Sequence, residues 1–399
     1  MTAPEASPSG LVYLDHCATS FPKPPEVYAA MDRVARTLGV NPGRSGYDLC
    51  LAAGDVVEEA RRAVAGLFGC HDPSRVVFGL NATDALNLAI FGLLSPNDHA
   101  VTSALDHNST LRPLWHLHEA GMALDIVGFD GQGFLDPDDV IRRLRPTTRA
   151  VVLNHASNVL GTVQPIAPIG RACRERGIPL VLDVSQSAGA LPVDMETLGV
   201  DVLCFTGHKS LMGPMGTGGM CVREGVELRQ SRAGGTGVRS IERRHLPEYP
   251  FRMEYGTPNL PGIGGLLAGV RWVQAEGIAA LQAREHALWL RLRAGLAAIP
   301  GLRLYGQQRE RDHLAVVAFN VDGFLAGDVG TLLDVDHGIA CRTGLHCAPR
   351  VHEALGTAAI KGAVRFGIGP FVTEAEIDHA IAAVAGIAAF GRTRPPTLT

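Results

Sequence analysis

From about residue 75 onward, short apolar runs rich in β-branched residues alternate with longer stretches in which apolar positions recur every three or four residues. The short runs predict buried strands, and the longer stretches predict amphipathic helices. The predicted strands are 75–79, 99–104, 124–128, 149–154, 179–183 and 202–205, and the helices between them include 83–94, 109–120 and 165–176. This alternation indicates an α/β fold in which helices flank a mixed, mostly parallel sheet on both faces.

The pattern changes after a stretch rich in glycine and proline at 256–265. A long helical pattern at 266–299, a strand near 315–320 and a helix near 374–390 predict a smaller α+β domain at the C-terminal end. We therefore predict three parts of the chain: an N-terminal segment 1–22 that packs on the small domain, a large ligand-binding domain 23–258, and a small domain 259–399.

The charge and the cysteine content exclude several classes of partner. The net charge is −4 and basic residues are scattered, so we expect no nucleic acid and no anionic membrane as partner. We find no signal peptide and no apolar run near the roughly 18 residues that span a bilayer, and we expect a cytoplasmic protein. The eight cysteines include no CxxC pair, so we expect reduced thiols and no metal site of the usual zinc spacing.

Lysine is rare in this chain, which narrows the search for a reactive amine. Of 36 basic residues only Lys23, Lys209 and Lys361 are lysines. Lys209 follows the predicted strand 202–205 in the turn FTGHKS. In a cleft, desolvation would lower the pKa of its amine and make it a nucleophile toward an aldehyde. The alternative is an ordinary exposed loop lysine.

A carboxylate and an anion site lie near the same predicted sheet edge, where α/β proteins bind ligands. Asp183 ends the strand 179–183 and could keep the pyridine nitrogen of pyridoxal 5'-phosphate (PLP) protonated. Thr83 lies at a predicted helix N-terminus, which favours a phosphate. His107 follows the strand 99–104 and could lie flat on an aromatic cofactor. The alternatives are turn and helix caps and a solvated histidine.

A cysteine and a run of glycines complete the candidate chemistry. Cys347 lies in the turn RTGLHCAP, where Arg342 and His346 could stabilise a thiolate. An inert buried thiol is the alternative. The glycines at 213–219 do not open an amphipathic helix, so we do not interpret them as a dinucleotide-binding loop.

These features together resemble the cysteine desulfurase and selenocysteine lyase family, within the class V aminotransferase group of fold-type I PLP enzymes. The resemblance covers nearly the whole chain, from LDHCATSFPKP at Leu14 to VRFGIGPF, which ends at Phe371. Its motifs are NATDALNLAI, SNVLGT, DVSQSAG, FTGHK, EYGTPN and RTGLHCAP.

The resemblance implies roles for individual residues. Lys209 would be the Schiff-base lysine, Asp183 the pyridinium partner and His107 a catalytic residue stacked on the cofactor ring. Other cofactor contacts would come from Gln186, Ala82, Thr83, Thr206 and His208, and from Gly256 and Thr257, which would reach the phosphate of the neighbouring subunit in a homodimer. Arg365, Asn158 and Arg342 would bind the substrate. Cys347 would form the persulfide, in a short, ordered loop similar to that of SUF-type desulfurases.

The chain departs from the family pattern at His16 and Cys17, where many relatives have small residues, and at Ala82, where SUF-type enzymes have a threonine.

The expected reaction converts L-cysteine to L-alanine and leaves the sulfur on Cys347, for transfer to an acceptor protein or a small thiol. Selenocysteine is a second candidate substrate. A PLP aminotransferase or C–S β-lyase and a non-catalytic sulfur carrier or assembly partner are the alternatives.

Overall fold

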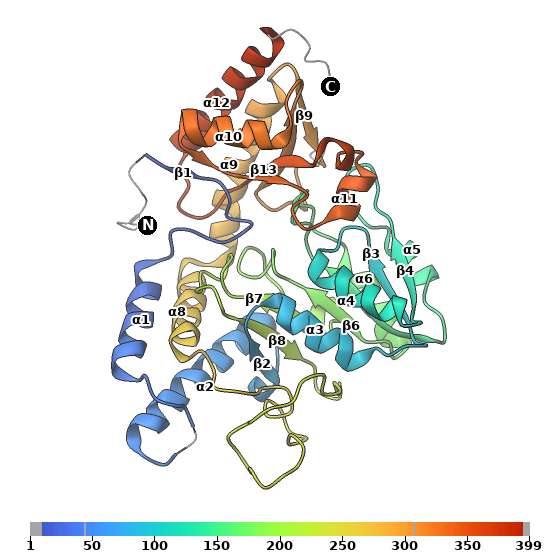
Figure 1. Ribbon diagram of the computed structural model, residues 1–399, viewed down its shortest axis with the longest axis vertical. Coiled ribbons are helices and arrows are strands. Elements are labelled where there is room, and N and C mark those ends of the chain that lie inside the picture. Colours follow the sequence, from blue (N-terminus) through green and yellow to red (C-terminus); the bar gives the residue numbers. More distant parts are fainter. Residues whose placement is uncertain (1–9, 44, 307–308, 394–399) are drawn as a thin grey trace.

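A computed structural model describes residues 10–43, 45–306 and 309–393 of the chain. Figure 1 shows a large lower body built around one sheet and a smaller upper body that contains the C-terminal third of the chain. Within the described residues no helix has both the length and the apolar character needed to cross a bilayer.

The large body contains a seven-stranded sheet with the order β2-β8-β7-β6-β5-β3-β4. Its strands are β2 (Val76–Gly79), β3 (His99–Ser103), β4 (Ala123–Val127), β5 (Thr148–Asn154), β6 (Leu180–Asp183), β7 (Val202–Thr206) and β8 (Gly218–Val222). Only β8 runs antiparallel to its neighbours in this sheet. The predicted mixed, mostly parallel sheet is therefore confirmed.

Both faces of this sheet are covered, which explains the continuous apolar runs in the sequence. Leu180 and Leu182 pack in one core with α2 (Asp48–Phe68) and α6 (Ile166–Glu175). Val181, between them, packs in a second core. That core includes residues of α3 (Ala82–Leu93) and α4 (Asn108–Glu119). Alternate side chains of a strand point to opposite faces, so a strand buried on both sides has no polar alternation.

The sequence-based prediction lacks strand β8 because this strand begins with two glycines, a residue type that is uncommon in strands. A Cβ on Gly218 would lie 2.6 Å from the Cα of Asn81, and one on Gly219 would lie 2.1 Å from the carbonyl oxygen of Val77. Neighbouring backbone therefore leaves no room for a side chain at these positions. Gly218 and Gly219 lie in a strand, and the other glycines of 213–219 precede this strand and not a helix, which agrees with rejecting a dinucleotide-binding loop here.

The small body contains an antiparallel sheet of order β12-β13-β10-β9. Its strands are β9 (Leu302–Tyr305), β10 (Val316–Val321), β12 (Arg342–Gly344) and β13 (Ala363–Gly367). Helices α9 (Ile278–Ala297), α10 (Ala326–His337) and α12 (Glu374–Thr393) cover it, and the short α11 (Pro349–Ala354) lies at its junction with the large body (Figure 1). The N-terminal strand β1 (Val12–Tyr13) pairs with β11 (Ile339–Ala340) in this part of the molecule.

The single long helix predicted at 266–299 is wrong. The chain forms α8 (Leu260–Glu276) and then α9, with Gly277 between them at φ 80°. Glycine adopts positive φ without a steric cost, so it permits the turn between the two helices. Helix α8 packs on α1 (Pro25–Thr37) and α2 in the large body. The domain boundaries at residues 22 and 258 stay predictions.

Candidate active site

A cavity of about 250 Å³ lies beyond the carboxyl ends of β5, β6 and β7. The last residues of these strands, Asn154, Asp183 and Thr206, all line it. Most of the predicted site residues line the same cavity: Ala82, Thr83, His107, Asn158, Asp183, Gln186, Thr206, His208, Lys209, Arg342 and Arg365. The parallel strands bring these residues together because they end at one edge of the sheet.

Lys209 lies in this cavity just after β7, and the N-terminal segment holds its backbone. Ser20 Oγ donates to the carbonyl of Lys209 at 2.9 Å, and Lys23 Nζ donates to the carbonyl of His208 at 2.8 Å. Burial lowers the pKa of the Lys209 amine, and the nearby carboxylate of Asp183 opposes this effect. A lowered pKa increases the fraction of the neutral amine, which is the nucleophilic form.

The side chains of Asp183 and His107 are fixed by the serines that follow them. Asp183 is buried, and its Oδ1 accepts from the backbone N–H of Ser185 at 2.9 Å and from its hydroxyl at 2.5 Å. The Nδ1 of His107 accepts from the N–H of Ser109 at 3.0 Å, which caps α4. Burial and the nearby Lys209 lower the pKa of His107 to about 3, so its ring is neutral near pH 7.

One end of the cavity is suited to an anion. The first turn of α3 begins there, with its N-terminal N–H groups unpaired within the helix, and the hydroxyl of Thr83 lies 2.7 Å from that of Ser109. Thr206 Oγ1 and His208 Nδ1 are buried and have no hydrogen-bond partner among the described residues. Phosphate oxygens would supply acceptors for these groups. The residues present therefore fit the phosphate of PLP, with Lys209 available for its aldehyde.

The opposite wall carries two arginines from the small sheet. Arg365 on β13 is fully buried. Its Nη1 donates to the carbonyl of Asn158 and its Nη2 to Asp15 Oδ1, each at 2.8 Å. Arg365 Nε and Asn158 Oδ1 remain unpaired among the described residues. Arg342 lies opposite Arg365 in the β12–β13 pairing. This wall is therefore basic and retains polar atoms for a carboxylate-bearing ligand.

Cys347 adjoins the cavity through Arg342, whose Nη2 lies 3.4 Å from the cysteine sulfur. The thiol is half-buried, and the N–H of Asn108 donates to the Cys347 carbonyl at 2.8 Å. The ring of His346 faces His352 and the carbonyl of Arg342 instead. Of the two neighbours expected to support a thiolate, only Arg342 contacts the sulfur within the described residues.

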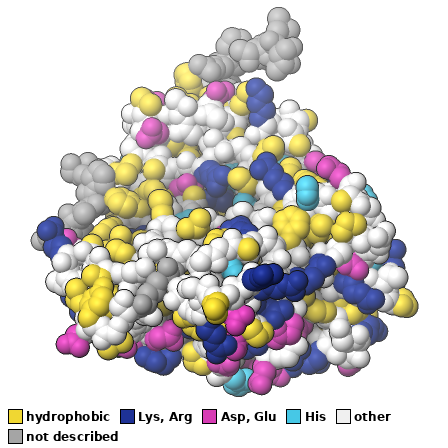
Figure 2. All heavy atoms as spheres, turned by 60° about the horizontal axis from the view of Figure 1, so that its bottom comes forward, with side chains coloured by type: hydrophobic (Ala, Val, Ile, Leu, Met, Phe, Trp, Pro, Cys, Tyr) yellow, Lys and Arg dark blue, Asp and Glu magenta, His cyan; other side chains and the backbone are white. Residues whose placement is uncertain are grey.

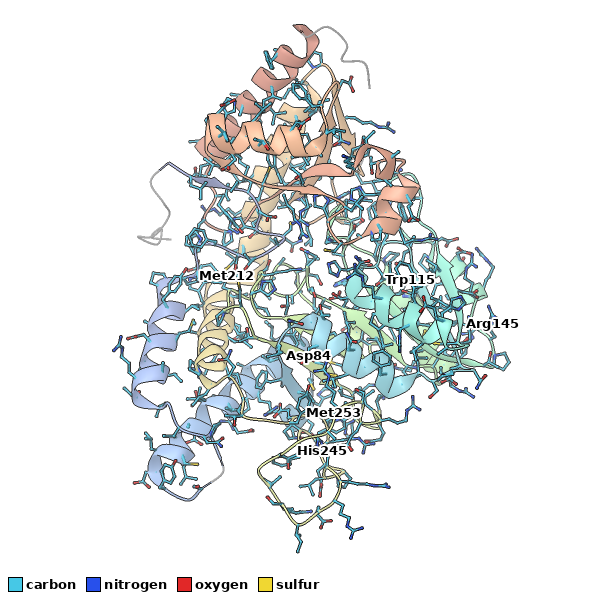
Figure 3. All side chains as sticks on the ribbon, viewed as in Figure 1. Asp84, Trp115, Arg145, Met212, His245 and Met253 are labelled. Atoms are coloured by element: carbon cyan, nitrogen blue, oxygen red, sulfur yellow. The ribbon has the colours of Figure 1, made fainter. Side chains whose placement is uncertain are left out.

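Gly256 and Thr257 lie elsewhere, in a separate cavity of about 530 Å³. Asp84 at the start of α3 and Met253 of the long loop before α8 also line that cavity, and Figure 3 shows the two close to each other. On the face shown in Figure 2, hydrophobic side chains lie among basic and acidic ones. In a single chain Gly256 and Thr257 are thus not part of the cavity that contains Lys209.

The two departures from the family pattern lie beside the cavity. Cys17 lines it, and the carbonyl of Cys17 accepts from Gln186 Nε2 at 3.1 Å. Burial raises the pKa of the Cys17 thiol, and it lowers the pKa of His16 to about 3. Both side chains are therefore uncharged near neutral pH.

Sequence reasoning missed three supporting residues: Asp15, Ser109 and Asn108. Asp15 belongs to the motif LDHCATS, and Ser109 and Asn108 directly follow His107. Asp15 and Ser109 could have been found as a possible partner for an arginine and a capping residue. The contact of Asn108 with Cys347 joins positions 239 residues apart, and no local signal indicates it.

Together, the fold and the cavity define an α/β protein with a ligand site at the carboxyl edge of a mixed sheet. The family Aminotransferase class-V matches residues 12–379. A probable cysteine desulfurase of Methanothermobacter thermautotrophicus is 33% identical over 92% of both chains, and a cysteine desulfurase of Dickeya dadantii is 33% identical over 89% of this chain and 84% of its own. The chain belongs to the class V aminotransferase family, whose members are PLP enzymes.

Solved structures agree with this assignment. The apo structure of a cysteine desulfurase from Thermococcus onnurineus NA1 has a TM-score of 0.88 and 32% identity over 95% of each chain. The cysteine desulfurase CsdA of Escherichia coli has a TM-score of 0.85 and 26% identity, over 96% of this chain and 95% of its own. The predicted family and the predicted α/β fold are both confirmed.

Proposed function

We propose that this protein is a PLP-dependent cysteine desulfurase that converts L-cysteine to L-alanine and takes the sulfur onto Cys347. One observation carries the proposal. A single cavity unites Lys209 and Asp183 with Arg365 and with Arg342, and Arg342 contacts the sulfur of Cys347. An aldehyde-binding amine, a carboxylate clamp and a thiol are the three groups that this reaction needs.

The cofactor would be held by residues of both the sheet edge and the α3 terminus. Lys209 would bind its aldehyde carbon, Asp183 its pyridine nitrogen, His107 its ring face and Gln186 its phenolic oxygen. The phosphate would be bound at the α3 end by the backbone of Ala82 and by the side chains of Thr83, Thr206 and His208. When bound, PLP supplies an electron sink for the negative charge that remains on a substrate after its α-proton is removed.

The substrate steps fall to residues of the chain itself. Arg365 would hold the substrate carboxylate, with Asn158 and Arg342 helping to orient it. The freed amine of Lys209 would take the α-proton. The Cys347 thiolate would then attack the substrate sulfur. The C–S bond would break as a persulfide forms on Cys347. The electron pair of the broken bond would remain on the three-carbon product, which is then protonated to alanine.

The test is alanine release from L-cysteine in the presence of a reductant, comparing the purified holoenzyme with Cys347→Ala. We expect release by the wild type, no release by the variant, and an unchanged cofactor absorbance in both. Equal release by both proteins would favour the β-lyase alternative, and amino-group transfer to a keto acid would favour the aminotransferase. For selenocysteine the thiol is expected to be less important, because selenium leaves more easily.

We also propose that the protein is a cytoplasmic homodimer whose partner subunit completes each cofactor site and that an acceptor protein or a small thiol removes the persulfide sulfur. The separation of Gly256 and Thr257 from the Lys209 cavity supports the dimer, because the family resemblance assigns both residues to a cofactor phosphate and their own chain does not bring them to one. Mixing Lys209→Ala with Thr257→Ala subunits tests it. Each mixed dimer would contain one intact site, so tight cofactor binding should return after subunit exchange, whereas contacts within one chain would not restore it.

A further inference from the structure

Two consecutive residues at the candidate sulfur-accepting turn adopt an unusual backbone conformation. His346 has φ 50° and Cys347 has φ 57°, in the left-handed region that side chains other than glycine rarely occupy. Histidine is one of the residue types that adopt this conformation more often than most, but cysteine is not, and neither residue is glycine or asparagine. Contacts from outside the turn must therefore stabilise it.

A chain of buried side chains lies directly behind the turn. His346 Nε2 lies 3.4 Å from the carbonyl oxygen of Arg342, and its Nδ1 lies 3.3 Å from Nε2 of His352. The other nitrogen of His352, Nδ1, lies 2.8 Å from Thr357 Oγ1. His352 is fully buried, and His346 and Thr357 are 2% exposed. His352 belongs to α11, at the junction of the two bodies (Figure 1).

The direction of every hydrogen bond in this series follows from the carbonyl oxygen of Arg342, at which the series ends. A carbonyl oxygen can only accept, so His346 Nε2 carries the proton. Burial lowers the pKa of His346 well below its usual value and that of His352 to about 4, so both rings are neutral. His346 Nδ1 is then an acceptor, and His352 Nε2 must donate to it. His352 Nδ1 in turn accepts from Thr357, whose hydroxyl lies farther, at 3.3 Å, from the His352 carbonyl.

Backbone contacts close the turn from the other side. Asn158 Nδ2 donates to the carbonyl of His346 at 2.6 Å, and the N–H of Asn108 donates to the carbonyl of Cys347 at 2.8 Å. Arg342 joins both systems, since its carbonyl accepts from the ring of His346 and its guanidinium contacts the sulfur of Cys347. The ring of His346 is thus held from behind while its backbone is held from the cavity side.

We propose that His352 is a positioning residue for Cys347: by donating to the ring of His346, it holds the left-handed turn that keeps the cysteine sulfur at Arg342. The inference rests on the proposed function of Cys347 as sulfur acceptor. His352 itself touches neither the cavity nor the thiol among the contacts of the described residues.

The test compares His352→Phe, which keeps a ring but loses the donor, with His352→Gln, which keeps an N–H donor. In the holoenzyme we expect His352→Phe to lower kcat for alanine release about tenfold, the effect of one lost hydrogen bond, with KM and the cofactor absorbance near wild type. His352→Gln should recover most of kcat. In His352→Phe only, crystal structures should show the turn outside the left-handed region or the Cys347 sulfur displaced from the Arg342 guanidinium.

His99→Phe is the matched control. His99 is also buried, and its Nδ1 lies 2.7 Å from Thr148 Oγ1. It is the first residue of β3, at the amino ends of the strands and thus at the opposite edge of the sheet from the cavity. Its variant should keep the wild-type kcat and turn. If His352→Phe does not fold, Thr357→Val, which removes the donor to His352, should lower kcat in the same direction.

An unchanged kcat and an unchanged turn in His352→Phe would overturn the proposal. Weaker cofactor binding and a higher KM, each changed as much as kcat, would also overturn it, because that pattern indicates a general loosening of the folded structure. If the wild type releases no alanine, the proposed function fails, but the crystal structures still decide whether His352 positions Cys347.

Discussion

The two reactive groups of the candidate site are held in different ways. Lys209 follows a strand that is buried on both faces in a mostly parallel sheet, and this sheet brings it to the same cavity as Asp183, with further contacts from the N-terminal segment. Cys347 lies in a turn after the short strand β12, and side chains and backbone from the large body hold it there. Groups placed by a sheet are set by the fold itself, whereas a group placed by single contacts can be displaced by single substitutions.

The largest effect is expected for Lys209→Ala. Under the proposed function, the variant would remove both the covalent attachment of the cofactor and the base that takes the α-proton, while Asp183 and the sheet remain intact. We expect alanine release to fall by about 10³-fold or more, within the range for loss of a positioned general base. Steady-state kinetics with added PLP checks this, and activity above one tenth of wild type would assign the base to another residue.

Asp183→Asn should have the next largest effect and tests the sheet-held region without changing its shape. The amide keeps the size of the side chain but loses the negative charge that would hold a proton on the cofactor nitrogen. We expect kcat to fall about 100-fold, as when one preorganised electrostatic group is removed. The cofactor absorbance should also shift, and equal spectra and rates would contradict the assigned role.

A buried histidine of the large body, His155, is expected to contribute to the loss of stability in acid. His155 follows β5 and is 5% exposed, and burial lowers its pKa to about 4. A depressed pKa in the folded state gives stability that is present above the unfolded value of roughly 6.5 and is lost as the pH falls through about 4. Unfolded protein therefore binds the extra proton near pH 5.

Removing this histidine should reduce the loss of stability in acid. Between pH 7 and pH 5 we expect His155→Gln to lose about 2 kcal/mol less of its free energy of unfolding than the wild type loses. Urea unfolding at both pH values measures the difference. A parallel decline of the two proteins would mean that His155 is protonated in the folded state.

The smallest effect concerns the small-body wall of the cavity. Arg365→Lys keeps the positive charge but removes the planar fork that bonds Asp15 and Asn158. We expect KM for L-cysteine to rise about tenfold while the cofactor absorbance is unchanged, since one charge-assisted hydrogen bond to the substrate is lost. An effect on kcat alone would place the substrate carboxylate elsewhere.

Local sequence patterns were sufficient to predict the strands of the large body except β8, and the residues at the ends of those strands. Continuous apolar runs specify strands that are buried on both faces, and parallel strands must end at one edge. Asp183 at the end of one predicted strand and Lys209 just after another therefore indicated the position of the site before any contact was known. The motifs around Lys209 and Cys347 added the chemistry.

Features that depend on contacts between distant segments became visible only in the three-dimensional structure. The close backbone around Gly218 makes a strand of a glycine-rich stretch, and Gly277 divides a helical pattern that looks continuous. Likewise, the pairing of Arg365 with Asp15 and the bonds that hold the Cys347 turn join residues far apart in the chain. Local patterns of hydrophobic residues do not indicate such contacts, because their free energy arises only when segments far apart in the chain pack together.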